Sequence, residues 1–451
     1  LGECLVKFDE KMNSTPWLAE NWQVSDDKLT WTFKINDKAK FSNGNKVTAE
    51  AVKKSIERTF EKAARARAMF EYDNISADGQ TLMIKTHTPV ATLPGMLGDP
   101  LFIIIDTSVT DRDYAKQGPI CTGPYMVNTY SKAKAVMDAN PNYWDGEVPF
   151  KHVEIPTIDD PNTRAMALQS GEIDMALLDP KNAENFKNID GYSCYDMTTS
   201  DYRGIMFNFA NDYWKENKDL IPAICYGIDR QAIIDAVLLG QGMPAYGPLQ
   251  RNIYNNEKAE HYDYNPEKAR KILEDAGCKM GKNGFYERNG EEIGFVLSVM
   301  SGEQDRIDIA QAAAQQLQEI GINCTVDIPA QIDWGGQMAC LIGWGSPFDA
   351  DDHTYKVFGT DKGANYSSYS NEKVDEYLTL ARQYEDQETR AKYYDLFQEE
   401  LLQDPPYAFI CYIDANYVAD SDIQGISENT VLGHHGVGIF WNIQDWEIVQ
   451  E

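Results

Sequence analysis

The sequence contains no long apolar run, and no segment approaches the roughly 18 consecutive apolar residues of a membrane-spanning helix. It also lacks the pattern of a secretory signal peptide, so the compartment cannot be read directly. Basic residues are few, because 41 Lys and Arg stand against 71 Asp and Glu, a formal net charge of −30. This acidity argues against nucleic acid and anionic membrane surfaces as partners, and it favours cationic ligands.

The signatures of common enzyme classes are missing as well. No GxSxG, Walker, GxGxxG or HExxH pattern occurs, which removes the usual hydrolase and nucleotide-binding interpretations. The eight cysteines form no CxxC pair, and none neighbours a histidine at metal-ligand spacing. Because most of them lie in apolar segments, we expect small buried thiols and no disulfide framework.

The chain has the length and composition of a folded protein with several domains. At about 150 residues per domain, 451 residues leave room for about three. A hydrophobic content of 43% and an aromatic content of 11% indicate a globular chain. Strand-like and helix-like segments alternate, which is typical of βαβ units, so we predict an α/β fold with mostly parallel sheets. The first residues carry no start signal, and we expect further chain upstream of them.

Local signals mark two helix starts and one linker. Thr48 caps a helix that has an apolar residue at every fourth position. Asn265 caps a second helix, with Pro266 at its first position and Gly277 at its end. Residues 240–248 contain two Pro and three Gly and form the predicted linker.

Residues 341–353, LIGWGSPFDADDH, are the stretch that the rest of the chain is arranged to present. The apolar run 339–342 predicts a strand buried on both faces, and two glycines and Pro347 then end regular structure. In an open α/β sheet, ligands bind just beyond the carboxyl ends of strands, where this loop would lie. The alternative is an ordinary strand-end loop with core aromatics.

Acids and histidines in and near this loop are candidates for chemistry. Asp351 and Asp352 are adjacent, and neighbouring acids on a loop are usually solvated, with no partner base apparent for catalysis. His353 shares the loop with three carboxylates and is a candidate metal or ligand contact, the alternative being an exposed histidine without a role. Of His434 and His435, at most one contacts a metal, because neighbouring side chains point apart in a strand.

Several segments together resemble the extracytoplasmic solute-binding proteins of ABC importers, in the class that takes oligopeptides, dipeptides and nickel complexes. The matches run in family order from residue 1 to about residue 420, and their combination is highly specific. The segments are "PWLAENWQVSDDKLTWTFKINDKAKFSNGNKVTAEAV", "CTGPYMV", "NPNYW", "IDDPNTRAMALQSGEID", "AICYGIDRQAIIDAVLLGQGMPAYGP", "YNPEKARKILEDAG" and "DPPYAFICY".

The resemblance implies a two-lobed, type II periplasmic-binding-protein-like fold, with an extra subdomain in the first lobe. The implied division is 1–13, 155–247 and 421–451 for the core of lobe I, 14–154 for the subdomain, and 248–420 for lobe II. Hinges are expected at 241–248 and near 417–426, and their rotation would close the lobes on a ligand. Phe440 and Trp441 would return to the first lobe.

The resemblance leaves the ligand open between a short peptide and a nickel chelate. The motif WGSPFD resembles the WGAPYDPH of nickel-binding members, in which Trp344 and Phe348 would correspond to pocket aromatics. Peptide binders carry an aspartate at the place of Pro347. The histidine that nickel binders use would fall near Gly363, and the arginines that grip the metal-carrying ligand are not preserved. We therefore expect any metal to enter with an organic chelator, and no tight binding of free nickel.

The predicted ligand site combines aromatic faces with charged groups that could fix the ends of a small ligand. Its candidates are Trp344, Phe348, Tyr202, Tyr366, Asp349 and Arg203, with His353 as candidate metal ligand. For each aromatic the alternative is core packing between the lobes, and for Arg203 it is an ion pair with a structural carboxylate.

The predicted function is a non-enzymatic receptor, the substrate-binding component of an ABC importer. It would capture a short peptide or small metal chelate and deliver it to the permease subunits, as a monomer without a cofactor or nucleic acid. The family implies an extracytoplasmic location, periplasmic or as a cell-surface lipoprotein attached through an upstream cysteine. The rival hypothesis is an enzyme or a ligand sensor on the same fold. Ligand-dependent stabilisation without turnover would favour the binder.

Overall fold

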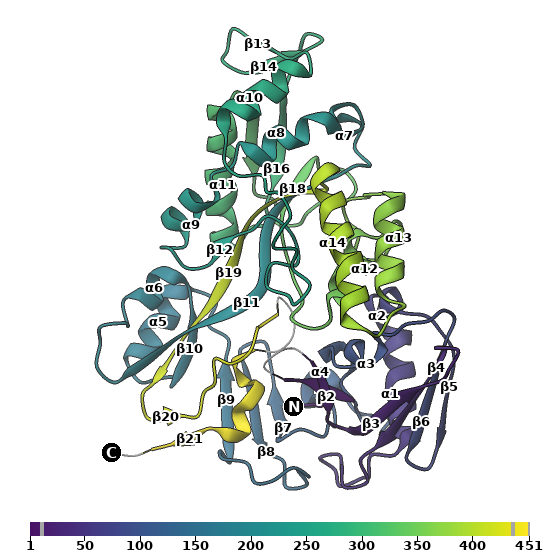
Figure 1. Cartoon of the computed structure of the whole chain (residues 1–451). Helices are drawn as coiled ribbons and strands as arrows, with labels where there is room; N and C mark the ends of the chain where they lie inside the picture. The colour runs from purple at the N-terminus through teal and green to yellow at the C-terminus, as the bar shows by residue number, and fades with distance from the viewer. Residues whose placement is uncertain (10–12, 434–437, 450–451) are drawn as a thin grey trace.

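The computed structural model describes residues 1–9, 13–433 and 438–449. Figure 1 shows two bodies joined by two long strands, β11 (Tyr192–Phe207) and β19 (Tyr407–Asp420). The lower body, which holds β2 (Ser14–Pro16) and β21 (Glu447–Ile448), is called the first lobe, and the upper body is called the distal lobe. No helix in the described ranges is long and apolar enough to cross a membrane.

The first lobe contains a subdomain built on a four-stranded antiparallel sheet in the order β3-β4-β6-β5. On β4, Trp31, Phe33 and Ile35 alternate with less buried residues, so their side chains meet one core. Its elements are β3 (Ala19–Val24), β4 (Thr30–Ile35), α1 (Ala49–Lys62), α2 (Ala64–Met69), β5 (Tyr72–Asp78) and β6 (Thr81–Thr86).

The rest of the first lobe surrounds a three-stranded sheet, β7-β8-β9, which shares a core with the C-terminal segment. Its elements are β1 (Val6–Phe8), β2 (Ser14–Pro16), α3 (Leu93–Met96), η1 (Pro100–Phe102), α4 (Tyr114–Gln117), β7 (Tyr125–Tyr130), β8 (Lys134–Ala139), β9 (His152–Pro156), α5 (Pro161–Gln169), β10 (Met175–Leu178), α6 (Pro180–Glu184), β20 (Ile423–Gln424), η3 (Ile439–Asp445) and β21 (Glu447–Ile448).

The largest sheet spans both lobes in the order β10-β19-β11-β18-β16-β17, with β12 also paired to β19. The prediction of mostly parallel sheets is wrong for the described strands, because only the β16–β17 and β16–β18 ladders are parallel. The β11–β19 ladder is antiparallel and shifts register between Thr198 and Tyr202. Below that shift the two strands pack in the first lobe, and above it they pack in the distal lobe.

The distal lobe wraps helices around the upper part of this sheet, and β18 is the buried strand predicted at 339–342. Asn265 caps α10 as predicted, with Pro266 as its first residue. The elements are α7 (Asp212–Asn217), η2 (Lys218–Leu220), α8 (Ile221–Tyr226), α9 (Arg230–Val237), β12 (Met243–Pro244), α10 (Pro266–Asp275), β13 (Lys279–Met280), β14 (Tyr286–Arg288), β15 (Glu291–Glu292), β16 (Gly294–Ser298), α11 (Gln304–Glu319), β17 (Asn323–Asp327), β18 (Ala339–Trp344), α12 (Ala350–Phe358), α13 (Glu372–Ala381) and α14 (Gln387–Gln403).

One apolar core in the distal lobe joins α8 and α9 to α10, α11 and the upper sheet. The core therefore groups residues 205–238 with residues 269–341, whereas the resemblance implies that 155–247 belong to the first lobe. The implied lobe and hinge boundaries stay predictions. All eight cysteines are free, and all except Cys194 are buried, in agreement with the expectation from their apolar contexts.

The cap of α1 gives a test of how far local signals stabilise the fold. The Thr48 hydroxyl accepts a hydrogen bond from the Ala51 amide, so Thr48→Ala should lower the free energy of unfolding by about 1 kcal/mol. Urea denaturation measures this change. Thr59→Ala is the control, because the Thr59 hydroxyl only donates to the Ser55 carbonyl inside the same helix. Equal stability of the Thr48 variant and the parent protein would show that the cap contributes nothing.

Candidate ligand-binding site

The loop that follows β18 is short and tightly held against β11. Gly345 has a φ of +155°, and a Cβ atom there would lie 2.0 Å from the Ser200 carbonyl oxygen, so only glycine fits. The loop ends at Asp349, whose side chain accepts a hydrogen bond from the Asp351 amide and caps α12. Residues 345–349 therefore form a compact connection between a buried strand and a helix.

Helix α12 corrects two of our expectations about this stretch. Asp351 and Asp352 lie on the helix and are buried, with exposed fractions of 1% and 2%, instead of being solvated on a loop. His353 is also buried, at 2%, and its Nε2 lies 3.2 Å from the Tyr202 hydroxyl. Asp351 and His353 are buried against partners far along the chain, Thr92 and Tyr202, which no local pattern reveals.

A cavity of about 1080 Å³ opens beside the loop. Almost all of its wall comes from the first lobe, and Pro347 and Phe348 are the contribution of the distal lobe. This volume lies at the upper end of the range of ligand pockets, roughly 300–1,000 Å³. Its aromatic lining residues are Phe8, Trp17, Tyr125, Tyr143, Phe348, Phe440 and Trp441.

Phe348 is the predicted site residue that reaches this cavity. It is only 2% exposed, and its ring centroid lies 5.0 Å from that of Phe8 on β1, in a tilted arrangement that joins the two lobes. The acidic side chains on the wall are Glu3, Asp9 and Asp145, against Lys7 as the basic one. This balance suits a ligand with a positively charged group, as the composition led us to expect.

The remaining predicted residues do not line this cavity. Tyr202 is fully buried beside His353, and Arg203 forms an ion pair with Asp201, the structural partnership given above as its alternative. Trp344 is half-buried, with its ring centroid 6.1 Å from that of Tyr366, which is 40% exposed.

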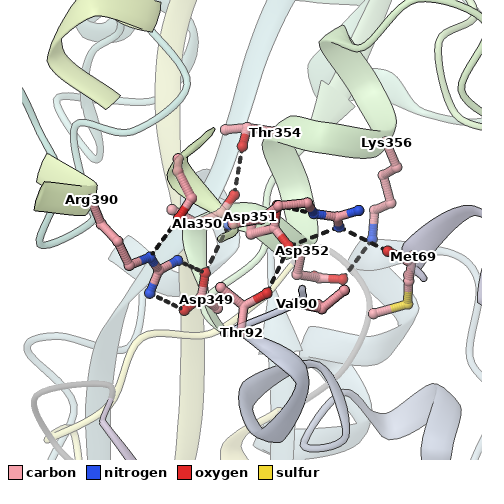
Figure 2. Close-up of polar contacts among 12 residues, drawn as sticks. Met69, Val90, Thr92, Asp349, Ala350, Asp351, Asp352, Thr354, Lys356 and Arg390 are labelled. Atoms are coloured by element: carbon pink, nitrogen blue, oxygen red, sulfur yellow. Dashed lines mark hydrogen bonds and ion pairs between the residues drawn. The ribbon is translucent and has the colours of Figure 1, made fainter. Parts of the chain in front are cut away.

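Asp349, besides capping α12, is bound by Arg390 of α14 (Figure 2). One of these hydrogen bonds, from Nη1 to Oδ2, measures 2.8 Å. The carboxylate that we predicted to fix one end of a ligand thus already has a guanidinium partner. It holds the loop between β18 and α12 in place.

Sequence reasoning missed most of the cavity wall. Phe8, Tyr125 and Met137 lie in segments far from the loop, and no local pattern marks them as ligand contacts. Phe440 and Trp441, which were expected to return to the first lobe, do line the cavity there. Among the described residues, no group of three or more His, Cys, Asp or Glu side chains is arranged to hold a metal ion. His434 and His435 lie outside the described residues.

Glu3 is the most unusual titratable group on the cavity wall. Its side chain is fully buried, and Oε2 accepts a hydrogen bond of 2.8 Å from the indole of Trp144. Burial raises the pKa of Glu3 to about 7, and the hydrogen bond from Trp144 offsets only part of that rise. Near neutral pH, this carboxyl group is therefore present in both its protonated and its ionised form.

Comparison with known proteins identifies the class to which this architecture belongs. Residues 13–366 match the sequence model of the family described as bacterial extracellular solute-binding proteins, family 5 Middle. The chain belongs to this family. Protein XP55 of Streptomyces lividans is 30% identical over 442 residues, which covers 94% of this chain and 80% of that relative. The predicted solute-binding role and two-lobed type II fold are thereby confirmed.

Two further similar proteins differ in the ligand that their name or structure records. The structure of NikZ from Campylobacter jejuni in complex with Ni(L-His) matches with a TM-score of 0.89 at 30% identity, covering 99% of this chain and 93% of that one. The oligopeptide-binding protein AppA of Bacillus subtilis is 26% identical over 476 residues, covering 98% of this chain and 85% of the relative. Both kinds of ligand thus occur among similar proteins.

The raised pKa of Glu3 predicts a pH dependence of stability. The folded state binds this proton more tightly than the unfolded state, so the contribution of Glu3 is fully present below about pH 4.5 and is lost as pH rises through about 7. In the parent protein, this loss lowers the free energy of unfolding by roughly 2–3 kcal/mol between about pH 4.5 and pH 7, and Glu3→Gln should abolish that decrease. Urea unfolding at pH 5 and pH 7.5 measures it. The exposed Glu147→Gln serves as control and should keep the parent slope; an unchanged slope in the Glu3 variant would refute the assignment.

Proposed function

We propose that this protein captures a small charged solute in the cavity between its lobes and delivers it to an ABC permease. The observation that carries the proposal is the cavity of about 1080 Å³, whose wall from the first lobe is completed by Pro347 and Phe348 of the distal lobe. Closing two lobes around a ligand excludes water from it and strengthens polar contacts with it. The ligand then has to wait for lobe opening before it can leave.

The ligand class that we favour is a small metal chelate, with a short peptide as the second candidate. The NikZ structure, 30% identical and similar over 99% of this chain, holds Ni(L-His), whereas AppA at 26% identity is named for oligopeptides. Phe348 is proposed as the main distal-lobe contact, with Asp349 next to it in the loop and Trp344 at the end of β18 as further contacts. The acidic wall offers partners for a cationic complex or for a peptide amino terminus.

Tyr202, Arg203 and Tyr366 remain proposed contributors, because Tyr202 and Arg203 pair with the end of β18 and Tyr366 contacts Trp344 there. Direct metal coordination by His353 stays a prediction, and the position of that residue beside Tyr202 places it in the core of the distal lobe. We also propose attachment to the cell surface through a lipidated cysteine upstream of this sequence. Cell fractionation of the full-length protein, with and without a globomycin-type block of lipoprotein processing, tests the anchor.

The ligand is identified by titration calorimetry of unfolded and refolded, ligand-free protein. The probes are nickel alone, nickel with free L-histidine, and a mixture of short peptides. We expect binding of nickel with histidine and none of nickel alone at micromolar concentration. Binding of peptides only would move the protein to the peptide class. Conversion of any bound compound into a product, followed by mass spectrometry, would favour the rival enzyme hypothesis over the binder.

Phe348→Ala tests the proposed contact directly. The variant should bind nickel with histidine at least about fivefold more weakly than the parent, because a buried aromatic in a binding site contributes roughly 1–3 kcal/mol and about 1.4 kcal/mol is a factor of ten. Trp344→Ala, measured in parallel, decides whether the neighbouring aromatic contributes as well. Tyr130→Ala is the matched control, since Tyr130 is 54% exposed on β7 and does not line the cavity. Parent affinity in the Phe348 variant would remove this residue from the site.

A further inference from the structure

The N-terminal part of α12 forms a second contact between the lobes, separate from the cavity wall. It lies against α2 and α3 of the first lobe, as Figure 1 shows. Asp351 on α12 and Arg382, which caps the end of α13, belong to the distal lobe. Thr92, which precedes α3, and Met69, the last residue of α2, belong to the first lobe. Asp351, Arg382 and Thr92 are all buried, with exposed fractions of 1%, 6% and 4%.

Three hydrogen bonds cross the boundary here. The Thr92 hydroxyl donates to Asp351 Oδ2 over 2.9 Å (Figure 2). Arg382 Nη2 donates to the Met69 carbonyl over 2.8 Å, and the Ala91 amide donates to the Arg382 carbonyl over 2.8 Å. Thr92 precedes α3, but its hydroxyl does not cap that helix and instead bonds the carboxylate of the opposite lobe.

The ion pair within this group does not itself cross the boundary. Arg382 binds Asp351 through Nε at 3.2 Å and Nη2 at 2.9 Å, and both residues belong to the distal lobe. Separating the lobes therefore leaves the charge pair intact and exposes it to water. What opening breaks is the set of three crossing hydrogen bonds, two of which involve a charged partner and are the stronger kind.

A second group of charges lies beside the first. Asp352 pairs with Lys356 over 2.9 Å in the distal lobe, and Asp99 pairs with Arg65 over 2.7 Å in the first lobe. Burial, followed by the nearby charge of Asp352, raises the pKa of Asp99. Burial alone would raise the pKa of Asp352, but the charge of Lys356 and its hydrogen bond hold that pKa below its ordinary value. Each lobe thus brings a paired carboxylate to the boundary, so closure buries no isolated charge.

We propose that Thr92, Asp351 and Arg382 form a latch that holds the lobes closed and thereby positions Phe348 in the cavity. Phe348 precedes Asp349, the cap of α12, by one residue, so any movement of α12 away from α3 carries Phe348 away from Phe8. The latch touches no ligand, because none of its three residues lines the cavity. The latch therefore sets the dissociation rate of a bound ligand, independently of the identity of that ligand. Its effect on affinity rests on the proposed function, whereas its effect on closure does not.

Thr92→Val is the decisive variant, since it removes the hydroxyl and keeps the shape of the side chain. Thr354→Val is the matched control: its hydroxyl, equally buried, donates to the Ala350 carbonyl over 2.9 Å within α12 and crosses no boundary (Figure 2). The ligand-free proteins are compared by hydrogen exchange of the segment that contains Ala91 and by small-angle X-ray scattering. We expect exchange about tenfold faster at Ala91, and a larger radius of gyration, in Thr92→Val alone.

The second measurement is the dissociation rate of nickel with L-histidine by stopped flow. Thr92→Val should release this probe roughly tenfold faster with little change in association rate, because the cavity wall is intact. A parent protein that fails to bind the probe would refute the proposed ligand, and the exchange data would still decide the latch. Parent-like exchange and parent-like scattering in Thr92→Val would overturn the latch. If Thr354→Val changed exchange and scattering as much as Thr92→Val does, the changes would be due to a general loss of stability and not to the latch.

Discussion

The pairing of β11 with β19 is the constraint on which the two-lobed architecture depends. These strands run antiparallel through both lobes, and their register shifts between Thr198 and Tyr202, where the first lobe gives way to the distal lobe. A continuous ladder resists shear along the sheet, but an interruption of the ladder lets the strands bend locally. On β11, Tyr202 and Arg203 pair with Trp344 and Gly343 at the end of β18. The register shift therefore lies directly beside the loop that bears Phe348.

This arrangement explains why the loop is so short and so fully constrained. Gly345 lies against the Ser200 carbonyl at the crossing, and Asp349 is held by Arg390 at the other end of the loop. Between these fixed points, Phe348 has little freedom and follows the distal lobe as a rigid body. A ligand contact on such a support loses little conformational entropy on binding, which is the physical advantage of a preorganised site.

The parts that could be predicted from sequence are those whose cause is local. Thr48 and Asn265 cap helices because a side-chain oxygen meets the amide three residues on, and β18 is buried because its residues are uniformly apolar. The family resemblance added the two lobes. Strand direction was mispredicted because alternating strands and helices suggested crossovers, whereas β11 and β19 pair across about two hundred residues of sequence.

The burial of Asp351 could not be predicted for the same reason, since Thr92 lies 259 residues from it and Arg382 lies 31 residues from it. Phe8 and Trp441 likewise reach one cavity from opposite ends of the chain. A histidine or a pair of acids has the same local pattern whether it is solvated or buried. Only the positions of distant partners decide between the two, and those positions are set by the global fold.

The polar character of the boundary between α12 and α3 also has a physical reason. An apolar surface there would gain free energy on closure but would be exposed to water on every opening, at a cost proportional to its area. Paired charges and hydroxyl groups hydrate well when the lobes separate, and their partners satisfy them when the lobes meet. The free-energy difference between the open and closed states is therefore small. A reversible carrier requires this, because the protein must both hold its ligand and release it. Buried ion pairs that lie within one lobe, joined to the other lobe by a few hydrogen bonds, meet both demands.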